Sequence, residues 1–215
     1  MNVSLRAGAL LILLTSAVAE ECSERHIWET KTCLRSYYAG FGIDASKTLP
    51  EFLEFEKHLS DIVSVFKAAG IHQLCLSERA LEGCLGNLFN ETTCAYPTAF
   101  EKMFGIDKIA ATMYATDIRA RSFECTQEDF LIKHLQCMFD VKKKHSDDIV
   151  TCQKDLVKEI KEGTMICKAF VNFIGCFQKV YRTECGNDID KFLCETMEVT
   201  LLFNYPKCKS SFPKC

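Results

Sequence analysis

"CKAFVNFIGCFQKVYRTECGNDIDKFLC", residues 167–194, contains four cysteines, each nine residues after the one before. Nine residues turn an α-helix by about 900°, so successive cysteines on one helix point to opposite faces. Cys167 and Cys185 would share a face but lie about 27 Å apart along the axis. Gly186 is expected to end the helix, which places Cys194 on the next one. Such sulfurs cannot converge on one metal ion or form one redox pair, so we predict that they join a central helix to neighbours on both sides.

The first residues of the chain have the layout of a secretory signal peptide. Arg6 precedes an apolar run over residues 7–14, and Ala17 and Ala19 are the small residues that a signal peptidase recognises. The run is too short to span a bilayer, which takes about 20 apolar residues. We predict a signal peptide over residues 1–19, cleavage after Ala19, and a secreted, extracellular protein with no membrane span.

The charge balance of the chain argues against nucleic acid as a partner. Removal of residues 1–19 takes away one cation and changes the formal net charge from −3 to −4. Nucleic-acid-binding proteins usually carry a basic excess.

Cysteine usage fits the predicted export. The chain has 14 cysteines, all of them beyond residue 19. An even number in an oxidising compartment predicts disulfides, here up to seven, although spacing alone does not give their connectivity. The predicted disulfide cysteines are Cys22, Cys33, Cys75, Cys84, Cys94, Cys125, Cys137, Cys152, Cys167, Cys176, Cys185, Cys194, Cys208 and Cys215.

Hydrophobic periodicity predicts an all-α protein, a disulfide-stapled bundle of about eight helices. The clearest pattern lies in residues 48–70, where Phe52, Phe55, Leu59, Ile62 and Phe66 form one apolar stripe. Thr48 is expected to cap this helix and Gly70 to end it. The other helices are expected at residues 24–39, 77–90, 106–121, 127–144, 147–162, 165–185 and 188–203. Residues 20–205 would form the helical domain and residues 206–215 an irregular, cysteine-containing tail.

The cysteine spacings suggest an internal repeat of residues 22–94 in residues 125–185. The five cysteines of residues 22–94 match five cysteines of residues 125–185 at offsets of 103, 104, 92, 92 and 91 residues. Glycine precedes the fourth cysteine in both halves. Coincidence among many cysteines is the alternative to a duplication. In either case, we expect the first helix of each half to be bridged to the helix that carries cysteines nine residues apart.

Cys152 and Cys194 have no counterparts in the first half, where Ser60 and Lys102 stand at the equivalent positions. Two cysteines that are missing together are simply explained as partners. We therefore predict a Cys152–Cys194 bridge.

No motif for metal binding or catalysis is present. Zinc ligands usually come in close pairs such as C-x2-C, and only His134 and Cys137 approach that spacing. There is no H-E-x-x-H, G-x-S-x-G or glycine-rich phosphate loop. The five histidines stand in unrelated contexts. We expect no metal, no cofactor and no catalytic residues, while a triad built from distant residues stays possible in principle.

Asn90, in the sequon Asn90-Glu91-Thr92, is the one N-glycosylation site predicted for the secreted chain.

Four segments together resemble a known family: "ECSERHIWETKTC", "CLSERALEGCLGNLFNETTC", "FECTQEDFLIKHLQC" and "CKAFVNFIGCFQKVYRTEC". In this order after a signal peptide, they resemble a secreted cysteine-rich helical domain of unknown function that is expanded in nematodes. The resemblance covers about Cys22 to Cys194. It implies an extracellular, disulfide-bonded helical fold and carries over no catalytic or binding residue.

These observations favour a non-enzymatic extracellular recognition module, whose partner would be another protein or a glycan. A carrier of a small apolar ligand is the alternative: most of the 16 phenylalanines have the spacing of core residues, and a lipid-sized cavity among them is compatible with that spacing. A secreted hydrolase is a third hypothesis.

Overall fold

The computed structural model describes residues 22–88 and 93–215. These residues form nine α-helices and two 3-10 helices, and none of them lies in a strand. The chain divides into two compact units, unit 1 (residues 1–128) and unit 2 (residues 129–215). The all-α prediction is confirmed. The predicted signal peptide with its cleavage site at Ala19, and the sequon at Asn90, lie outside the described residues.

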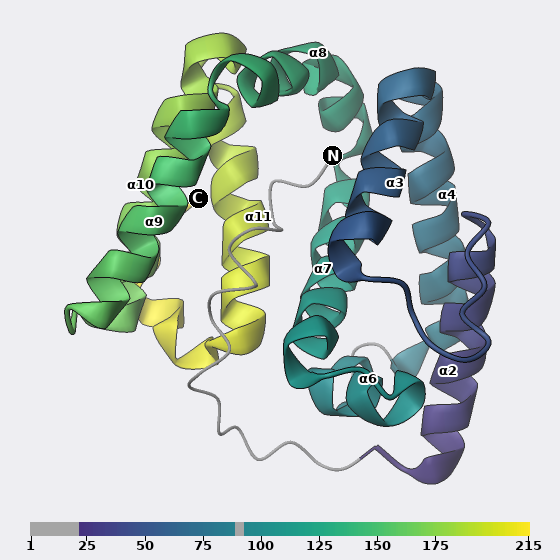
Figure 1. The fold of residues 1–215 in the computed structure, drawn as a ribbon. Coiled ribbons are helices and arrows are strands. Elements are labelled where there is room, and N and C mark those ends of the chain that lie inside the picture. Colours follow the sequence, from purple (N-terminus) through teal and green to yellow (C-terminus); the bar gives the residue numbers. More distant parts are fainter. Residues whose placement is uncertain (1–21, 89–92) are drawn as a thin grey trace. The chain divides into compact units, whose positions relative to one another are not determined.

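Unit 1 is arranged around α4 (Figure 1). Its elements are α2 (Glu24–Ala39), α3 (Phe52–Phe66), α4 (Ala68–Leu85), the 3-10 helix η1 (Thr93–Ala95), α6 (Pro97–Phe104) and α7 (Lys108–Thr126). α4 packs against α2, α3 and α7. We call α4 the hub helix of unit 1.

Unit 2 is arranged around α10. Its elements are α8 (Glu128–Lys144), α9 (Ser146–Lys161), α10 (Ile166–Cys185), α11 (Ile189–Asn204) and the 3-10 helix η2 (Pro206–Ser211). α10 packs against α9, α11 and η2, and Figure 1 shows it beside α9 and α11. α10 is the hub helix of unit 2.

All fourteen cysteines are paired, and every bridge joins two cysteines of the same unit. The bridges of unit 1 are Cys22–Cys94, Cys33–Cys84 and Cys75–Cys125, and those of unit 2 are Cys137–Cys185, Cys152–Cys176, Cys167–Cys208 and Cys194–Cys215. The cysteines of α10 therefore reach three different elements, α8, α9 and η2. The predicted role of the nine-residue ladder is confirmed, as is the bridge from α2 to the hub helix of its unit.

The predicted Cys152–Cys194 bridge is wrong. α9 and α10 form a hairpin with a short connection, which brings Cys152 opposite Cys176. Cys194 instead bonds Cys215, because the tail after η2 returns to α11. The two cysteines without counterparts in the first half thus belong to two separate bridges and do not bond each other.

The bridges do not follow the proposed internal repeat. The Cys33–Cys84 bridge would correspond to Cys137–Cys176, but Cys137 bonds Cys185. Cys125, expected to begin the second half, bonds Cys75 in unit 1. The cysteine spacing therefore does not predict the pairing, and the duplication stays a prediction.

The helix expected over residues 48–70 ends earlier, and the one expected at residue 77 starts earlier. Lys67 has φ 53°, which breaks the helix between α3 and α4. Gly70 does not end a helix. It lies buried in the first turn of α4, where a Cβ atom would be 2.9 Å from the Ile62 carbonyl oxygen. Glycine is needed there because the two helices approach each other at their backbones.

Four further differences separate the prediction from the structure. Thr48 does not cap α3, whose first residue follows Glu51. Phe66, predicted to lie in the core, is 62% exposed because α3 ends beside it. α6 was not expected, and residues 206–211 of the tail form η2 rather than an irregular segment.

Candidate functional site

Three of the five histidines, His58, His72 and His145, have partners for their side chains within the fold. His58 Nε2 lies 2.9 Å from the Phe41 carbonyl oxygen, and His72 Nδ1 lies 2.7 Å from a Glu128 carboxylate oxygen. His145 contacts the carboxylates of Asp148 and Glu184 at 3.1 and 3.2 Å. These hydrogen bonds, with Asp148 first, raise the pKa of His145.

His134 and Cys137 do not form a metal site. Cys137 is bonded to Cys185, and the His134 ring stacks on Phe130 with the ring centres 4.2 Å apart. Burial lowers the pKa of His134, which favours the neutral imidazole. Within residues 22–88 and 93–215, no group of three or more potential ligands among His, Cys, Asp and Glu could hold a metal ion.

The outer face of α2 combines an exposed tryptophan with exposed cationic side chains. Arg25, Trp28, Thr32 and Arg35 are all exposed, and Trp28, the only tryptophan of the chain, is 68% exposed. At 100° per residue, these four positions fall within an arc of about 80°. The opposite side of α2 is buried and includes Cys33, Leu34, Tyr37 and Tyr38. We call the four exposed residues the α2 face.

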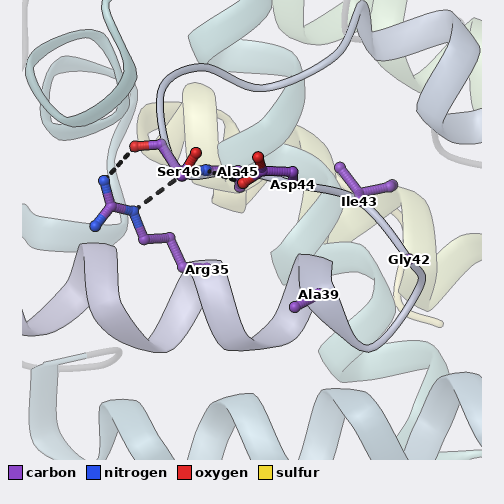
Figure 2. A pocket seen from close by; sticks show the side chains of 7 residues that line it. All are labelled: Arg35, Ala39, Gly42, Ile43, Asp44, Ala45 and Ser46. Atoms are coloured by element: carbon purple, nitrogen blue, oxygen red, sulfur yellow. Dashed lines mark hydrogen bonds between the residues drawn. The ribbon is translucent and has the colours of Figure 1, made fainter.

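The arginines of the α2 face have defined partners. Arg25 Nε donates to a Glu29 carboxylate oxygen at 2.8 Å, one helical turn away. Arg35 donates through Nε to the Ala45 carbonyl oxygen at 3.3 Å and through Nη2 to the Ser46 carbonyl oxygen (Figure 2). Both guanidinium groups are therefore oriented before any partner binds.

An open depression of about 390 Å³ adjoins the C-terminal end of the α2 face. Arg35, Ala39 and residues 42–46 line it, and Figure 2 shows the Arg35 side chain reaching to the loop. Asp44 Oδ1 accepts a hydrogen bond from the Ser46 backbone N–H at 2.8 Å, and hydrogen bonds from Ser46 lower the pKa of Asp44. The depression thus has a charged rim beside exposed apolar atoms.

Several contacts fix α2 in place. Cys22, two residues before α2, bonds Cys94, and Cys33 bonds Cys84 of α4. Lys31 donates to the Met103 carbonyl oxygen, and its ammonium lies 5.4 Å from the centre of the Phe104 ring. A surface held in this way loses little conformational entropy on binding.

The sequence contained part of this signal. The spacing of three, four and three residues already places the four side chains on one side of a helix. It does not show which side faces solvent, and a lone tryptophan is ordinarily expected to be buried to a large extent.

Comparisons with protein-family models, curated proteins and solved structures found no match to this chain. The resemblance to the nematode domain therefore rests on cysteine order and helical spacers alone. No helix within the described ranges is long and apolar enough to cross a membrane.

Proposed function

We propose that this chain is a secreted, non-enzymatic recognition module that binds an extracellular protein or glycan through the α2 face. The observation that carries the proposal is the exposure of Trp28 between two oriented arginines on a helix fixed by disulfides. Tryptophan and arginine are enriched among the residues that dominate binding energy at interfaces. An exposed tryptophan gains most from being covered by a partner.

The location supports this proposal. Seven disulfides and the absence of free cysteines among the described residues fit an oxidising compartment. An N-terminal segment with signal-peptide layout fits the same location.

The alternative of an apolar-ligand carrier gains no support from the depression beside α2. A carrier needs an enclosed apolar cavity that covers most of the ligand. This depression is open and has Arg35, Asp44 and Ser46 in its lining.

The test is a binding screen of the chain, purified from a eukaryotic secretory host, against arrays of extracellular proteins and glycans. For any ligand found, Trp28→Ala is expected to weaken binding by about tenfold or more, because it removes the central anchor of the α2 face. Arg35→Ala is expected to weaken binding less.

Leu53→Ala provides the matched control, because Leu53 lies on α3 and is 63% exposed. It is expected to leave the affinity within about twofold, as residues outside an interface do. A ligand that binds Trp28→Ala and the unaltered chain equally well would refute the α2 face. Turnover of a substrate by the purified chain would refute the non-enzymatic proposal.

A further inference from the structure

Unit 1 contains a group of charged side chains in its interior. Arg121 of α7 is 1% exposed, and its Nε donates to an Asp117 carboxylate oxygen at 2.7 Å. Its Nη2 donates to a carboxylate oxygen of Glu56 from α3. The guanidinium also lies 5.5 Å from the centre of the Phe55 ring. These contacts compensate the buried positive charge of Arg121.

Glu78 of α4 is buried in the same interior without such a partner. Its side chain is 0% exposed, and neither carboxyl oxygen has a hydrogen bond within ordinary distance. The buried hydroxyl groups of Tyr37 and Tyr38 from α2 have no hydrogen-bond partner either. An ionised carboxylate without a partner is very costly inside a protein, and the neutral acid is the favoured form.

The balance of charge works in the same direction. The titratable and charged groups that share this interior with Glu78 are Tyr37 and Tyr38 of α2, Glu56 of α3, Glu82 of α4, and Asp117, Arg121 and Glu124 of α7. Among the described residues of this group, Arg121 is the one cation, and it already has two carboxylate partners. Ionised Glu78 would therefore add a negative charge for which these residues offer no second cation.

The pKa values agree with this geometry. Burial raises the pKa of Glu78 to about 8, against the lowering effects of the Arg121 charge and of the nearby Tyr37 hydroxyl, which does not meet hydrogen-bond geometry with the carboxyl group. Burial also raises the pKa of Glu124 to about 7. Tyr37, buried beside Glu78, keeps its proton throughout, because burial raises its pKa well above the usual value.

We propose that Glu78 is an internal proton-binding site, and that loss of its proton loosens the packing of α4 against α2 and α7. Unit 1 would then open more readily in mildly alkaline than in mildly acidic solution. The bridges Cys33–Cys84 and Cys75–Cys125 lie at either side of Glu78 on α4 and hold the helix while the charge forms. The response is therefore a local loosening between stapled helices.

The direction of the effect follows from proton linkage. The pKa of Glu78 in the folded chain is about 8, above the value of 4.5 for an unperturbed glutamate. Between these two pH values, the folded state binds more protons than the unfolded state, so stability falls as pH rises. The contribution of Glu78 is fully present below pH 4.5 and is lost as pH rises through about 8.

Amide hydrogen exchange of the full chain tests this proposal with the variant Glu78→Gln. Glutamine has nearly the same shape and stays neutral. Protection of α2 and α4 amides, corrected for the intrinsic exchange rate, is measured between pH 5 and pH 8. We expect the ratio of unaltered to variant protection to fall on the order of a hundredfold over this range.

Glu54→Gln is the matched control, because Glu54 is an exposed glutamate of α3 in the same unit. It is expected to keep the pH dependence of the unaltered chain. Equal pH dependence in the unaltered chain and in Glu78→Gln would overturn the proposal.

Infrared spectroscopy of the unaltered chain provides a test that needs no variant. Protonated Glu78 is expected to give a carbonyl band at pH 6.5 that persists after Glu124 has lost its proton near pH 7 and disappears only above pH 8. Absence of that band at pH 6.5 would overturn the proposal even if the variant does not fold.

Discussion

The two hub helices, α4 and α10, have a similar arrangement of disulfides, but the interiors in which they lie differ in polarity. Each carries cysteines nine residues apart that are bonded to neighbouring elements. Three residues after the first of these cysteines, α4 has Glu78 and α10 has Phe170, and both side chains are 0% exposed. The same register therefore holds a carboxyl group in unit 1 and a hydrocarbon ring in unit 2.

The surroundings of the two positions differ in the same way. The buried charged residues in the described part of the chain, Glu78, Asp117, Arg121 and Glu124, all belong to unit 1. The buried polar residues of unit 2 are His134, Thr196 and Thr200. Around Phe170, unit 2 packs aromatic rings such as Tyr205, whose centre is 5.1 Å away.

This difference shows what disulfides permit. A buried charge destabilises a fold unless it is well paired, whereas a disulfide stabilises it mainly by restricting the unfolded chain. The bridges of unit 1 can thus offset the cost of its polar interior. We expect the buried groups of unit 1, and not those of unit 2, to lower stability as pH rises, because the pKa of Glu78 is raised whereas that of His134 is lowered.

The largest expected effect follows from removing the buried cation. Arg121→Met removes the buried cation that pairs with Asp117 and Glu56. Removal of one member of a buried ion pair typically costs about 3–5 kcal/mol. Urea unfolding is monitored by hydrogen exchange of an α7 peptide for unit 1 and an α9 peptide for unit 2. The loss of stability should appear in unit 1 alone.

Arg182→Met in unit 2 is the control for this substitution. Arg182 pairs with Asp190, but its side chain is 47% exposed. Exposed ion pairs contribute little, so no change beyond the error of the measurement is expected. Equal destabilisation by the two substitutions would remove the difference between the units.

A smaller effect is expected from pH. Because the raised pKa of Glu78 makes the folded state retain a proton, this group alone should lower the stability of unit 1 by about 3 kcal/mol between pH 5 and pH 8. In unit 2, Lys144 and His145 lower the pKa of Glu184, whose stabilising effect is present above its ordinary pKa. His145, at the surface, adds only a small loss of stability as pH rises through its raised pKa. Hydrogen exchange of α4 and α10 peptides in one sample compares the two units directly. A parallel fall in both units would contradict a special role of the polar interior.

The sequence predicted much of the fold because helical periodicity agrees with the helix start and stop signals along most of the chain. The helix expected at residues 24–39 has those bounds. The helices expected at 127–144 and 165–185 each begin one residue later, and the one expected at 188–203 begins and ends one residue later. The sequence predictions fail where tertiary contacts determine the ends of the helices. Lys67 breaks a continuous apolar pattern, and Gly70 serves a close contact between helices rather than a stop.

The candidate sites were less predictable for a related reason. Glu78 and Arg121 are residue types that are almost always exposed, and a buried charge depends on partners from other helices. Asp117 and Arg121, four residues apart, were the one local hint. The bridge partners likewise depend on which helices pack together, which cysteine spacing does not specify.

Mass spectrometry of non-reduced peptides, from the chain secreted by a eukaryotic host, tests the central claim most directly. That claim is that each hub helix is bonded only within its own unit. We predict bridges from Cys167, Cys176 and Cys185 of α10 to Cys208, Cys152 and Cys137, and from Cys75 and Cys84 of α4 to Cys125 and Cys33. A peptide pair that links a cysteine of residues 22–125 to one of residues 137–215 would contradict it.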